Sequence, residues 1–299
     1  MKTIYKSLLV FLLISFLTSP LSSGAAAGEG FTVTDFAGRK VTFTSVPERI
    51  ISLAPSNTEI LFALGAGDKV VGVTTFANYP EEARDKPRVG DVNPNLEKIA
   101  IQRPDVIFTM GGMDEVVQKL TAIGYKVVVI DPQKIDDIFQ AIDLISRVTA
   151  TRDRAEELIG ELRQRIAAVE EAVRDVENRP SVFYEVWDEP LMTAGPGTFI
   201  DSLIKMAGGR NVAGSLQQSW SQYSFERLLL DDPDIYLISW EDKGRVLERP
   251  GWSNLQAIKE GQVYIIDQDL ISRPGPRIVD ALEELARIIH PEAFPASNN

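Results

Sequence analysis

The stretch that most constrains the fold is a long amphipathic segment, residues 151–178, in the middle of the chain. Its apolar residues recur every three or four positions, with Glu, Arg and Gln between them, and they are Leu158, Ile159, Leu162, Ile166, Val169, Val173 and Val176. This spacing predicts one helix with a single apolar face. We expect the helix to end at Arg179, because a residue that precedes proline is pushed out of the α-helical region. At 1.5 Å per residue such a helix is about 40 Å long.

A helix of this length, with strand and helix patterns on both sides, favours a brace between two lobes over an ordinary crossover helix within one sheet. The chain has 299 residues with 44% hydrophobic content, enough for two cores of ordinary size. We therefore expect an α/β lobe in residues 28–150, a rigid bridging helix in residues 151–179 and a second α/β lobe in residues 180–299. Each lobe is expected to contain a parallel sheet, with a ligand cleft between the lobes.

Residues 1–27 have the order of a secretory signal peptide. Lys2 and Lys6 precede an apolar run, residues 7–17, and small residues follow it. A membrane anchor is the alternative, but the run is shorter than the ~20 residues that span a bilayer. The chain contains no cysteine, the residue to which a bacterial lipoprotein attaches its lipid. We therefore expect a freely soluble, periplasmic protein.

Composition excludes several classes of function. The formal net charge is −12, or −14 without the two lysines of the signal segment, so nucleic acid is a poor partner. The only histidine, His290, precedes a proline and is expected to end a helix or face solvent. Neither a Ser-His-Asp triad nor a histidine or thiolate metal cluster can be built, so we predict no catalytic and no metal-binding residue. A secreted hydrolase with two carboxylates from distant segments remains an alternative.

One pattern occurs on both sides of the long segment, in residues 95–107 and in residues 224–236. Each copy has a glutamate, Glu97 or Glu226, seven residues before a Pro-Asp pair, and an apolar strand follows the pair. The Pro-Asp pairs are expected to be structural, since they end helices and start strands. The chain therefore contains two copies of one lobe pattern.

The two glutamates have two possible roles. Each lies in the first turn of its predicted helix, where the helix dipole favours negative charge, so a capping role explains either one alone. Two equivalent glutamates on pseudo-symmetric lobes, however, would form a matched pair of acidic knobs. A receptor with two-fold symmetry could bind both knobs at once.

Aromatic and arginine side chains are concentrated in predicted loops between the lobes. They are Phe76 and Tyr79 in the first lobe, Trp187, Trp220 and Tyr223 in the second, and Arg273 and Arg277 in a proline-rich loop. Flat aromatic faces and fixed arginines suit a large ligand with broad apolar surface and some polar or anionic groups. Core packing is the alternative for any single tryptophan, and it is less plausible for Trp220, whose neighbours are all polar.

Three stretches resemble the extracytoplasmic substrate-binding proteins of cobalamin, haem and iron-siderophore ABC importers. They are residues 49–59, 95–105 and 273–277, and their spacing is most similar to that of the cobalamin-binding members. The resemblance implies two α/β lobes joined by a rigid helix, with little closure on binding. It implies a monomer without an intrinsic cofactor, which carries cobalamin or a related corrinoid to an ABC permease homodimer at the inner membrane.

The resemblance also implies roles for single residues. Glu97 and Glu226 would dock on arginines of the two permease subunits. Phe76 and Trp220 would contact the corrin. The loop that contains Arg273 and Arg277 would lie at the cleft.

One departure from the family pattern concerns the residues before the first glutamate. Cobalamin binders carry a tryptophan there, and this chain has Asp-Val-Asn at residues 91–93. A ferric-siderophore or haem carrier is therefore the alternative ligand assignment. Haem usually has a tyrosine or histidine on its iron, and Tyr79 or Tyr223 could serve.

Overall fold

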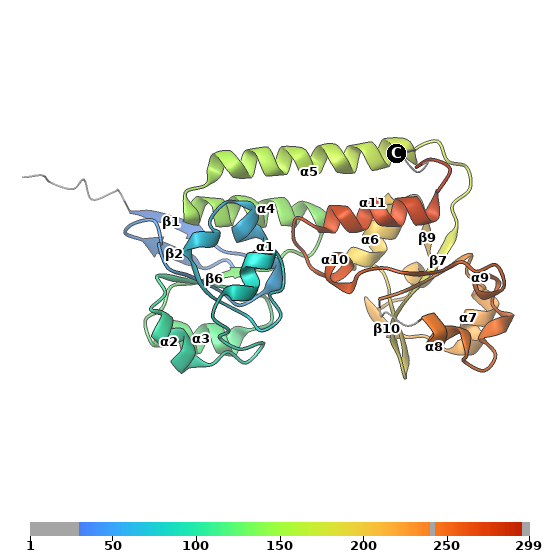
Figure 1. Ribbon diagram of the computed structural model, residues 1–299, viewed down its shortest axis with the longest axis horizontal. Helices are drawn as coiled ribbons and strands as arrows, with labels where there is room; N and C mark the ends of the chain where they lie inside the picture. The colour runs from blue at the N-terminus through green and yellow to red at the C-terminus, as the bar shows by residue number, and fades with distance from the viewer. Residues whose placement is uncertain (1–29, 240–242, 295–299) are drawn as a thin grey trace, which may run out of the picture.

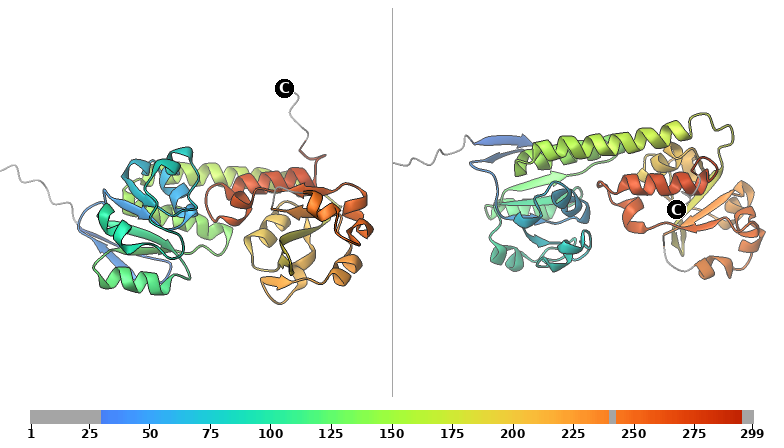
Figure 2. Two further views of the ribbon diagram at one scale, coloured as in Figure 1. Left: turned by 60° about the horizontal axis from the view of Figure 1, so that its bottom comes forward. Right: turned by 45° about the horizontal axis from the view of Figure 1, so that its top comes forward.

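The computed structural model describes residues 30–239 and 243–294, and it shows two α/β lobes side by side (Figure 1). Helix α5 (Arg152–Ala172) runs along one side of both lobes. It packs on α4 (Ile135–Thr149) of the first lobe and on α11 (Ile278–Ile289) of the second. Figure 2 shows α5 spanning both lobes from two other directions. The expected two-lobed fold with one long connecting helix is confirmed, and the expected signal peptide lies outside the described residues.

The sheet of the first lobe is parallel, with strand order β4-β3-β5-β6. Its strands are β3 (Ile50–Ser52), β4 (Val70–Val73), β5 (Val106–Met110) and β6 (Val127–Ile130). An antiparallel hairpin of β1 (Phe31–Thr34) and β2 (Lys40–Phe43) precedes it. The helices are α1 (Pro55–Ala63), α2 (Leu96–Gln102) and α3 (Asp114–Ala122), with 3-10 turns at η1 (Gly67–Lys69) and η2 (Glu81–Asp85).

The sheet of the second lobe is mixed, with order β10-β8-β7-β11-β12 and β9 beside β7. Parallel pairing joins β7 (Ser181–Asp188), β9 (Arg210–Asn211), β11 (Ile235–Ile238) and β12 (Val263–Ile265). The antiparallel strands β8 (Leu191–Ala194) and β10 (Trp220–Gln222) extend one edge beyond the expected parallel sheet. The helices are α6 (Phe199–Met206), α7 (Phe225–Asp231), α8 (Lys243–Leu247), α9 (Gln256–Lys259) and α10 (Gln268–Ser272), with 3-10 turns at η3 (Val212–Ser215) and η4 (Trp252–Asn254).

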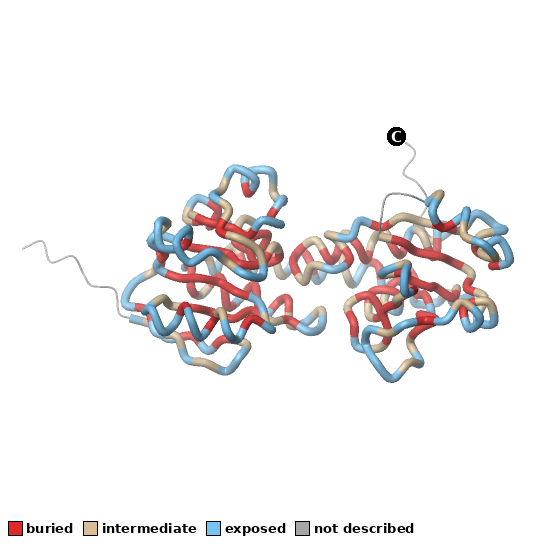
Figure 3. The backbone as a smooth tube through the Cα atoms, turned by 90° about the horizontal axis from the view of Figure 1, so that it is seen from below, coloured by how far each residue is buried: buried red, intermediate tan, exposed pale blue. Residues whose placement is uncertain are grey.

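Both sheets are covered on two faces, so neighbouring strand residues point into different layers. In β5, Phe108 belongs to the core under α4 and α5, whereas Ile107 packs on the α2 and α3 side. In β7, Tyr184 packs on the side covered by α6 and α11, whereas Phe183 packs on the side covered by α7. Buried positions run through the middle of each lobe (Figure 3). One core cluster continues from the first lobe through α4 and α5 into the second, which couples the two lobes.

The bridging helix is shorter than the sequence pattern predicts. It ends at Ala172, and Val173 leaves the helix with its side chain buried close to Gly208, which follows α6. The residues beyond this point include Asp175 and Asn178, which favour turns over helix interiors. With 21 residues, α5 is about 32 Å long. Among residues 30–239 and 243–294, neither α5 nor any other helix is long and apolar enough to cross a bilayer.

The repeated pattern forms the same local structure in both lobes. Each helix starts after a capping side chain, since Asn95 accepts a hydrogen bond from the Lys98 N–H and Ser224 accepts one from the Arg227 N–H. Each helix ends at a residue with positive φ, which is 44° in the first lobe and 35° in the second. A buried proline follows in both lobes.

The aspartate of each Pro-Asp pair ties the new strand to its neighbour. Asp105 Oδ2 accepts the N–H groups of Glu48 and Arg49, both at 2.9 Å, just before β3. Asp234 Oδ2 accepts the N–H and the hydroxyl of Ser181, both at 2.6 Å, at the start of β7. The structural role expected for the Pro-Asp pairs is confirmed.

The structure decides between the two roles expected for His290. His290 ends α11, which confirms the helix-ending role, and its side chain is 1% exposed. Its Nε2 atom lies 3.3 Å from the carbonyl oxygen of Gly208, beyond the end of α6. The histidine therefore has a packing role between two helices of the second lobe.

Candidate ligand site and docking surfaces

The carboxyl ends of the parallel strands in the two lobes are directed toward each other. Glu59 and Phe76 follow β3 and β4 in the first lobe, and both contact Arg273, which follows β12 and α10 in the second. Because β5 runs parallel to β3, its carboxyl end lies at the same edge. Ligands of open α/β sheets bind outside the carboxyl ends of the strands. We call the two sides of the lobes that face each other the facing edges.

Glu59 of the first lobe binds two arginines of the second lobe at the facing edges. Its Oε1 atom lies 2.6 Å from Nη2 of Arg277 and 3.1 Å from Nη1 of Arg273, and its Oε2 atom lies 2.9 Å from Nε of Arg277. Glu59 is 3% exposed. Asp269 adds a second carboxylate, 2.7 Å from Nη2 of Arg273. Two carboxylates therefore balance two guanidinium groups.

The loop after β4 is attached to the same cluster. Asn78 accepts a hydrogen bond from Arg273 at 2.7 Å and donates one to Asp269 at 2.8 Å. The guanidinium carbon of Arg277 lies 4.0 Å from the centroid of the Tyr79 ring. The two arginines lie at the facing edges, as expected. Their charges are neutralised by Glu59 and Asp269, so they do not form a free anion site.

Sequence reasoning missed Glu59, Asn78 and Asp269 as members of this cluster. A signal for Glu59 existed, because it is the one charged residue in the apolar helix α1. A lone carboxylate on a buried helix requires a cation as partner. The sequence did not say which cation, since Arg273 and Arg277 follow more than two hundred residues later.

Four of the predicted ligand-binding aromatics are exposed. Phe76 is 59% exposed and Tyr79 46% in the first lobe, and Trp220 is 53% exposed and Trp187 59% in the second. Trp220 lies in β10, the edge strand on the side of the second lobe nearest the first lobe (Figure 1). Trp187 lies near the end of β7, and its Nε1 atom donates to the carbonyl of Glu189. Exposed rings are therefore present on both facing edges.

Tyr223 differs from the other predicted aromatics, because its side chain is part of the core of the second lobe and is not available to a ligand. It is 4% exposed, and its ring meets Phe183 edge to face at a centroid distance of 5.1 Å. Its hydroxyl donates to Asp231, and burial raises its pKa to about 12. It alternates with exposed Trp220 and Gln222 along the chain, so it points to the core side of the sheet.

A hollow of about 400 Å³ opens at the carboxyl end of β5. Its lining includes Val92, Asn93, Met110, Gly111 and Met113. A side chain at Gly111 would meet the carboxylate of Asp131 at 2.2 Å, so a larger residue there would have to displace that carboxylate. The Asp-Val-Asn segment stands where the resemblance implies a tryptophan. It borders a hollow whose lining combines two methionines with charged side chains such as Asp114 and Lys119, and sequence reasoning did not find the methionines.

The carboxylates at the facing edge of the second lobe are held in ion pairs. Glu185 is fully buried, and it accepts a hydrogen bond from Tyr236 and lies 2.7 Å from Nη1 of Arg249. Burial raises its pKa, against the opposing effect of these two partners. Asp188 pairs with Arg245. In the part of the chain that the structure describes, no group of three or more His, Cys, Asp and Glu residues could hold a metal ion.

Glu97 and Glu226 both lie exposed in the first turns of α2 and α7. Within residues 30–239 and 243–294, neither carboxylate has an ion pair or a side-chain hydrogen bond with another residue. Helices α2 and α7 lie on the side of the molecule opposite α5 (Figure 1). The two carboxylates therefore belong to equivalent helices on one side of the protein.

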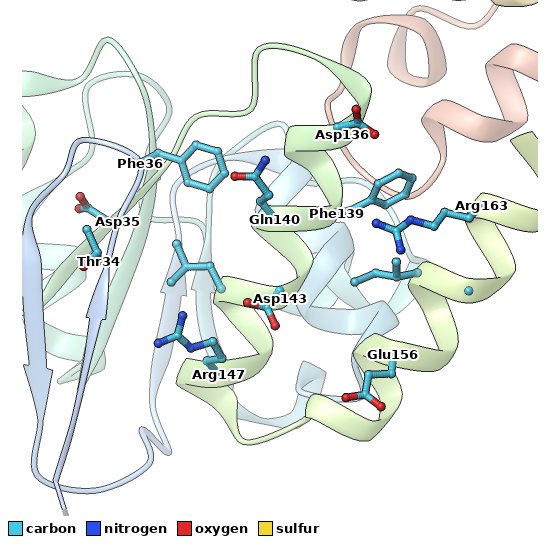
Figure 4. Close-up of a pocket in the computed structure, with 13 residues that line it drawn as sticks. Thr34, Asp35, Phe36, Asp136, Phe139, Gln140, Asp143, Arg147, Glu156 and Arg163 are labelled. Carbon is cyan, nitrogen blue, oxygen red and sulfur yellow. The ribbon is translucent and has the colours of Figure 1, made fainter.

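A hollow of about 1030 Å³ lies between the β1 end, α4 and α5 (Figure 4). Asp136, Asp143, Arg147 and Glu156 line it, with Arg163 stacked over Phe139 at 5.0 Å. None of the aromatic residues predicted to bind ligand and none of the loops at the facing edges contributes to it. Its lining carries charges of both signs, which is usual for a solvated surface between two helices.

The fold and the facing edges define the class of two-lobed α/β binding proteins with one long connecting helix. Residues 50–270 match the sequence pattern of the family described as "Periplasmic binding protein". The chain belongs to this family.

Three similar proteins illustrate its range. A Bacillus subtilis protein named an uncharacterized ABC transporter substrate-binding lipoprotein is 34% identical, over 88% of this chain and 86% of its own length. The crystal structure of the periplasmic vitamin B12 binding protein of Vibrio cholerae has a TM-score of 0.72 and 27% identity, covering 84% of this chain and 99% of that one. A periplasmic haem-binding protein from Roseiflexus has a TM-score of 0.75 and 28% identity, covering 82% and 99%.

Proposed function

We propose that this chain is the extracytoplasmic substrate-binding protein of an ABC importer, and that it captures cobalamin or a related corrinoid between its lobes. One observation carries the proposal: exposed aromatic rings on both facing edges, with Phe76 and Tyr79 on one side and Trp220 on the other. Such rings give a broad, flat ligand apolar contact from two sides. Membership of the family and the name of the Vibrio relative support the same ligand class.

The ligand assignment is tested by titrating the purified protein with cyanocobalamin and measuring the heat released. We expect saturable binding of one ligand per chain at micromolar or lower concentration, with quenching of tryptophan fluorescence. Absence of binding at micromolar ligand would contradict the corrinoid assignment.

Haem or a ferric siderophore is the second candidate for the ligand. Tyr79 favours it, because its ring is 46% exposed and is held in place by Arg277. A tyrosine oxygen can bind ferric iron directly. The absorbance spectrum after addition of haemin distinguishes the two assignments: a new iron-tyrosinate band in the native protein that Tyr79→Phe abolishes would favour haem.

Delivery of the ligand would use the two exposed glutamates. We assign Glu97 and Glu226 to docking on arginines of a permease homodimer, one glutamate for each subunit. The support is that they are equivalent, exposed and without partners among the described residues. In Glu97→Ala/Glu226→Ala, we expect uptake to be lost while ligand affinity stays unchanged; weakened ligand binding would contradict docking.

The carrier would act as a monomer in the periplasm and not as an enzyme, after export through a signal peptide in residues 1–27. The Bacillus relative is named a lipoprotein, whereas this chain contains no cysteine. The hydrolase alternative requires a free pair of carboxylates at the facing edges. Glu59, Glu185 and Asp188 are instead paired with arginines.

A further inference from the structure

Each docking helix carries an exposed aliphatic side chain beside its glutamate. Ile101 is 72% exposed and Leu230 is 87% exposed, the two highest values among the large hydrophobic residues that the structure describes. Ile101 follows Glu97 by four residues, and Leu230 follows Glu226 by four. Residues four apart lie next to each other on one side of a helix.

Packing within the fold does not explain why these two aliphatic side chains are exposed. Ile99 in α2 and Leu228 in α7, both fully buried, attach the helices to their lobes. A single exposed leucine or isoleucine on a protein surface is ordinary. Here the same exposed position recurs in both copies of the repeat, each time beside a glutamate without a partner among the described residues.

We propose that Ile101 and Leu230 are the apolar half of the docking surface, and that the partner presents two equivalent sockets, each with a cationic group beside an apolar recess. This inference rests on the proposed function, because it assigns both sockets to the two like subunits of the permease. We call the pairs Glu97–Ile101 and Glu226–Leu230 the two docking faces. Their equivalence on one side of the molecule matches a partner with two-fold symmetry.

Charge disfavours the other occupants of the docking faces. A second copy of this chain would bring glutamate against glutamate, whichever of the two faces meet. A lipid surface with anionic headgroups would repel a chain of formal charge −12. A basic protein surface pairs with the carboxylates and buries the aliphatic side chains in the same contact.

The first test measures binding of the ligand-loaded protein to membrane vesicles from the cells that produce it. We expect Ile101→Gln/Leu230→Gln to weaken this binding at least about ten-fold. Ligand affinity and melting temperature should stay unchanged, because both side chains are exposed. The matched control is Ile123→Gln, which changes an equally apolar, 59% exposed residue outside the repeat, and it should bind vesicles as the native protein does.

The glutamate variant Glu97→Gln/Glu226→Gln separates this inference from the proposed docking. If it loses vesicle binding while Ile101→Gln/Leu230→Gln binds normally, the aliphatic half of the docking surface is wrong and the glutamate docking stands. If neither double variant changes vesicle binding, both assignments are overturned. Equal binding of the native protein to protein-free lipid vesicles would also overturn the inference.

The second test identifies the partner and uses the absence of cysteine from the chain. Ile101→Cys and Leu230→Cys each provide a single thiol for a maleimide photocrosslinker. We expect both variants to form an adduct with one and the same membrane polypeptide. Gln164→Cys, on the exposed side of α5, should form none. Adducts with two different polypeptides, or with a second copy of this chain, would contradict the two equivalent sockets.

Discussion

The Nη2 atom of Arg277 lies 2.6 Å from Oε1 of Glu59, although the two residues belong to different lobes and are separated by more than two hundred positions. Glu59 is in α1, which follows the first strand of the parallel sheet, and Arg277 directly precedes α11. The Glu59 side chain is 2% exposed and the Arg277 side chain 16%, so removal of either partner leaves the other charge with little access to water. This contact and the shared core under α5 hold the two lobes in one arrangement.

Replacing Glu59 by glutamine should therefore destabilise the protein strongly. The variant leaves the largely buried guanidinium groups of Arg273 and Arg277 without the carboxylate that they share, and Asp269 remains as a carboxylate partner of Arg273 alone. We expect the free energy of unfolding to fall by about 3 to 5 kcal/mol, measured by urea denaturation.

The control for Glu59 is Glu48→Gln, which removes the ion pair with Lys69 at the surface, where the glutamate side chain is 71% exposed. This change should cost less than about 1 kcal/mol. Similar losses in the two variants would mean that the buried position of Glu59 has no special importance.

Trp220→Ala should weaken ligand binding without weakening the fold. Its ring is 53% exposed in an edge strand, so its removal creates no cavity in the core. We expect the dissociation constant for cyanocobalamin to rise at least about ten-fold, since exposed aromatic rings carry much of the affinity at such surfaces. Calorimetric titration checks this.

Tyr223→Phe is the matched control, because it keeps the ring and deletes the hydroxyl that donates to Asp231. Affinity should stay unchanged, and the free energy of unfolding should fall by about 1 kcal/mol. If Tyr223→Phe weakened ligand binding and Trp220→Ala did not, the assignment of the two residues would be reversed.

The stability contributed by the contact between α5 and α11 should depend on pH through the charge of Glu283. Arg165 donates a hydrogen bond to this carboxylate at 2.8 Å, which lowers the pKa of Glu283 below its usual 4.5. A depressed pKa contributes stability above the unfolded value and loses it as the pH falls through the folded value. Glu283→Gln should lower stability at pH 7 by up to about 1 kcal/mol, because the pair is partly exposed.

The measurement compares urea midpoints of Glu283→Gln and the native protein from neutral pH down to acidic pH, through and below the usual pKa of a glutamate carboxyl group. The difference should shrink as the solution is acidified below the usual pKa of 4.5. A difference that stayed constant with pH would show that Arg165 does not act through the charge of Glu283.

The broad architecture was predictable because it depends on the spacing of apolar residues, which can be counted directly in the sequence. The spacing from Leu158 to Val169 predicted α5, and the two Pro-Asp units predicted the equivalent helices α2 and α7. The end of α5 was not predictable from spacing. Val173 continues the apolar period of the helix, but the helix ends before it. Its side chain is buried beside Gly208, and this tertiary contact cannot be read from the spacing of apolar residues.

The site was predictable only in part, because residue type does not reveal the partner of a side chain. Arg273 and Arg277 were correctly expected at the edge between the lobes, but their partner Glu59 made them unavailable as a free anion site. Tyr223 was expected to contact ligand because, like Trp220, it is an aromatic residue in a predicted loop between the lobes. In a strand, however, the two positions point to opposite faces.

The last prediction compares the two copies of the Pro-Asp unit. Asp234 accepts the N–H and hydroxyl of Ser181, which is 3% exposed, whereas Asp105 accepts two N–H groups in an exposed segment. In Asp234→Ala, the donors of Ser181 stay buried without an acceptor, so we expect a loss of about 2 to 3 kcal/mol in the free energy of unfolding. In Asp105→Ala, water can reach the freed N–H groups, and the loss should be about 1 kcal/mol.

Urea denaturation of both variants checks the order of the two losses, and ligand affinity should be the same in both. Equal losses would mean that the burial of the donor groups does not determine how much each aspartate contributes to stability.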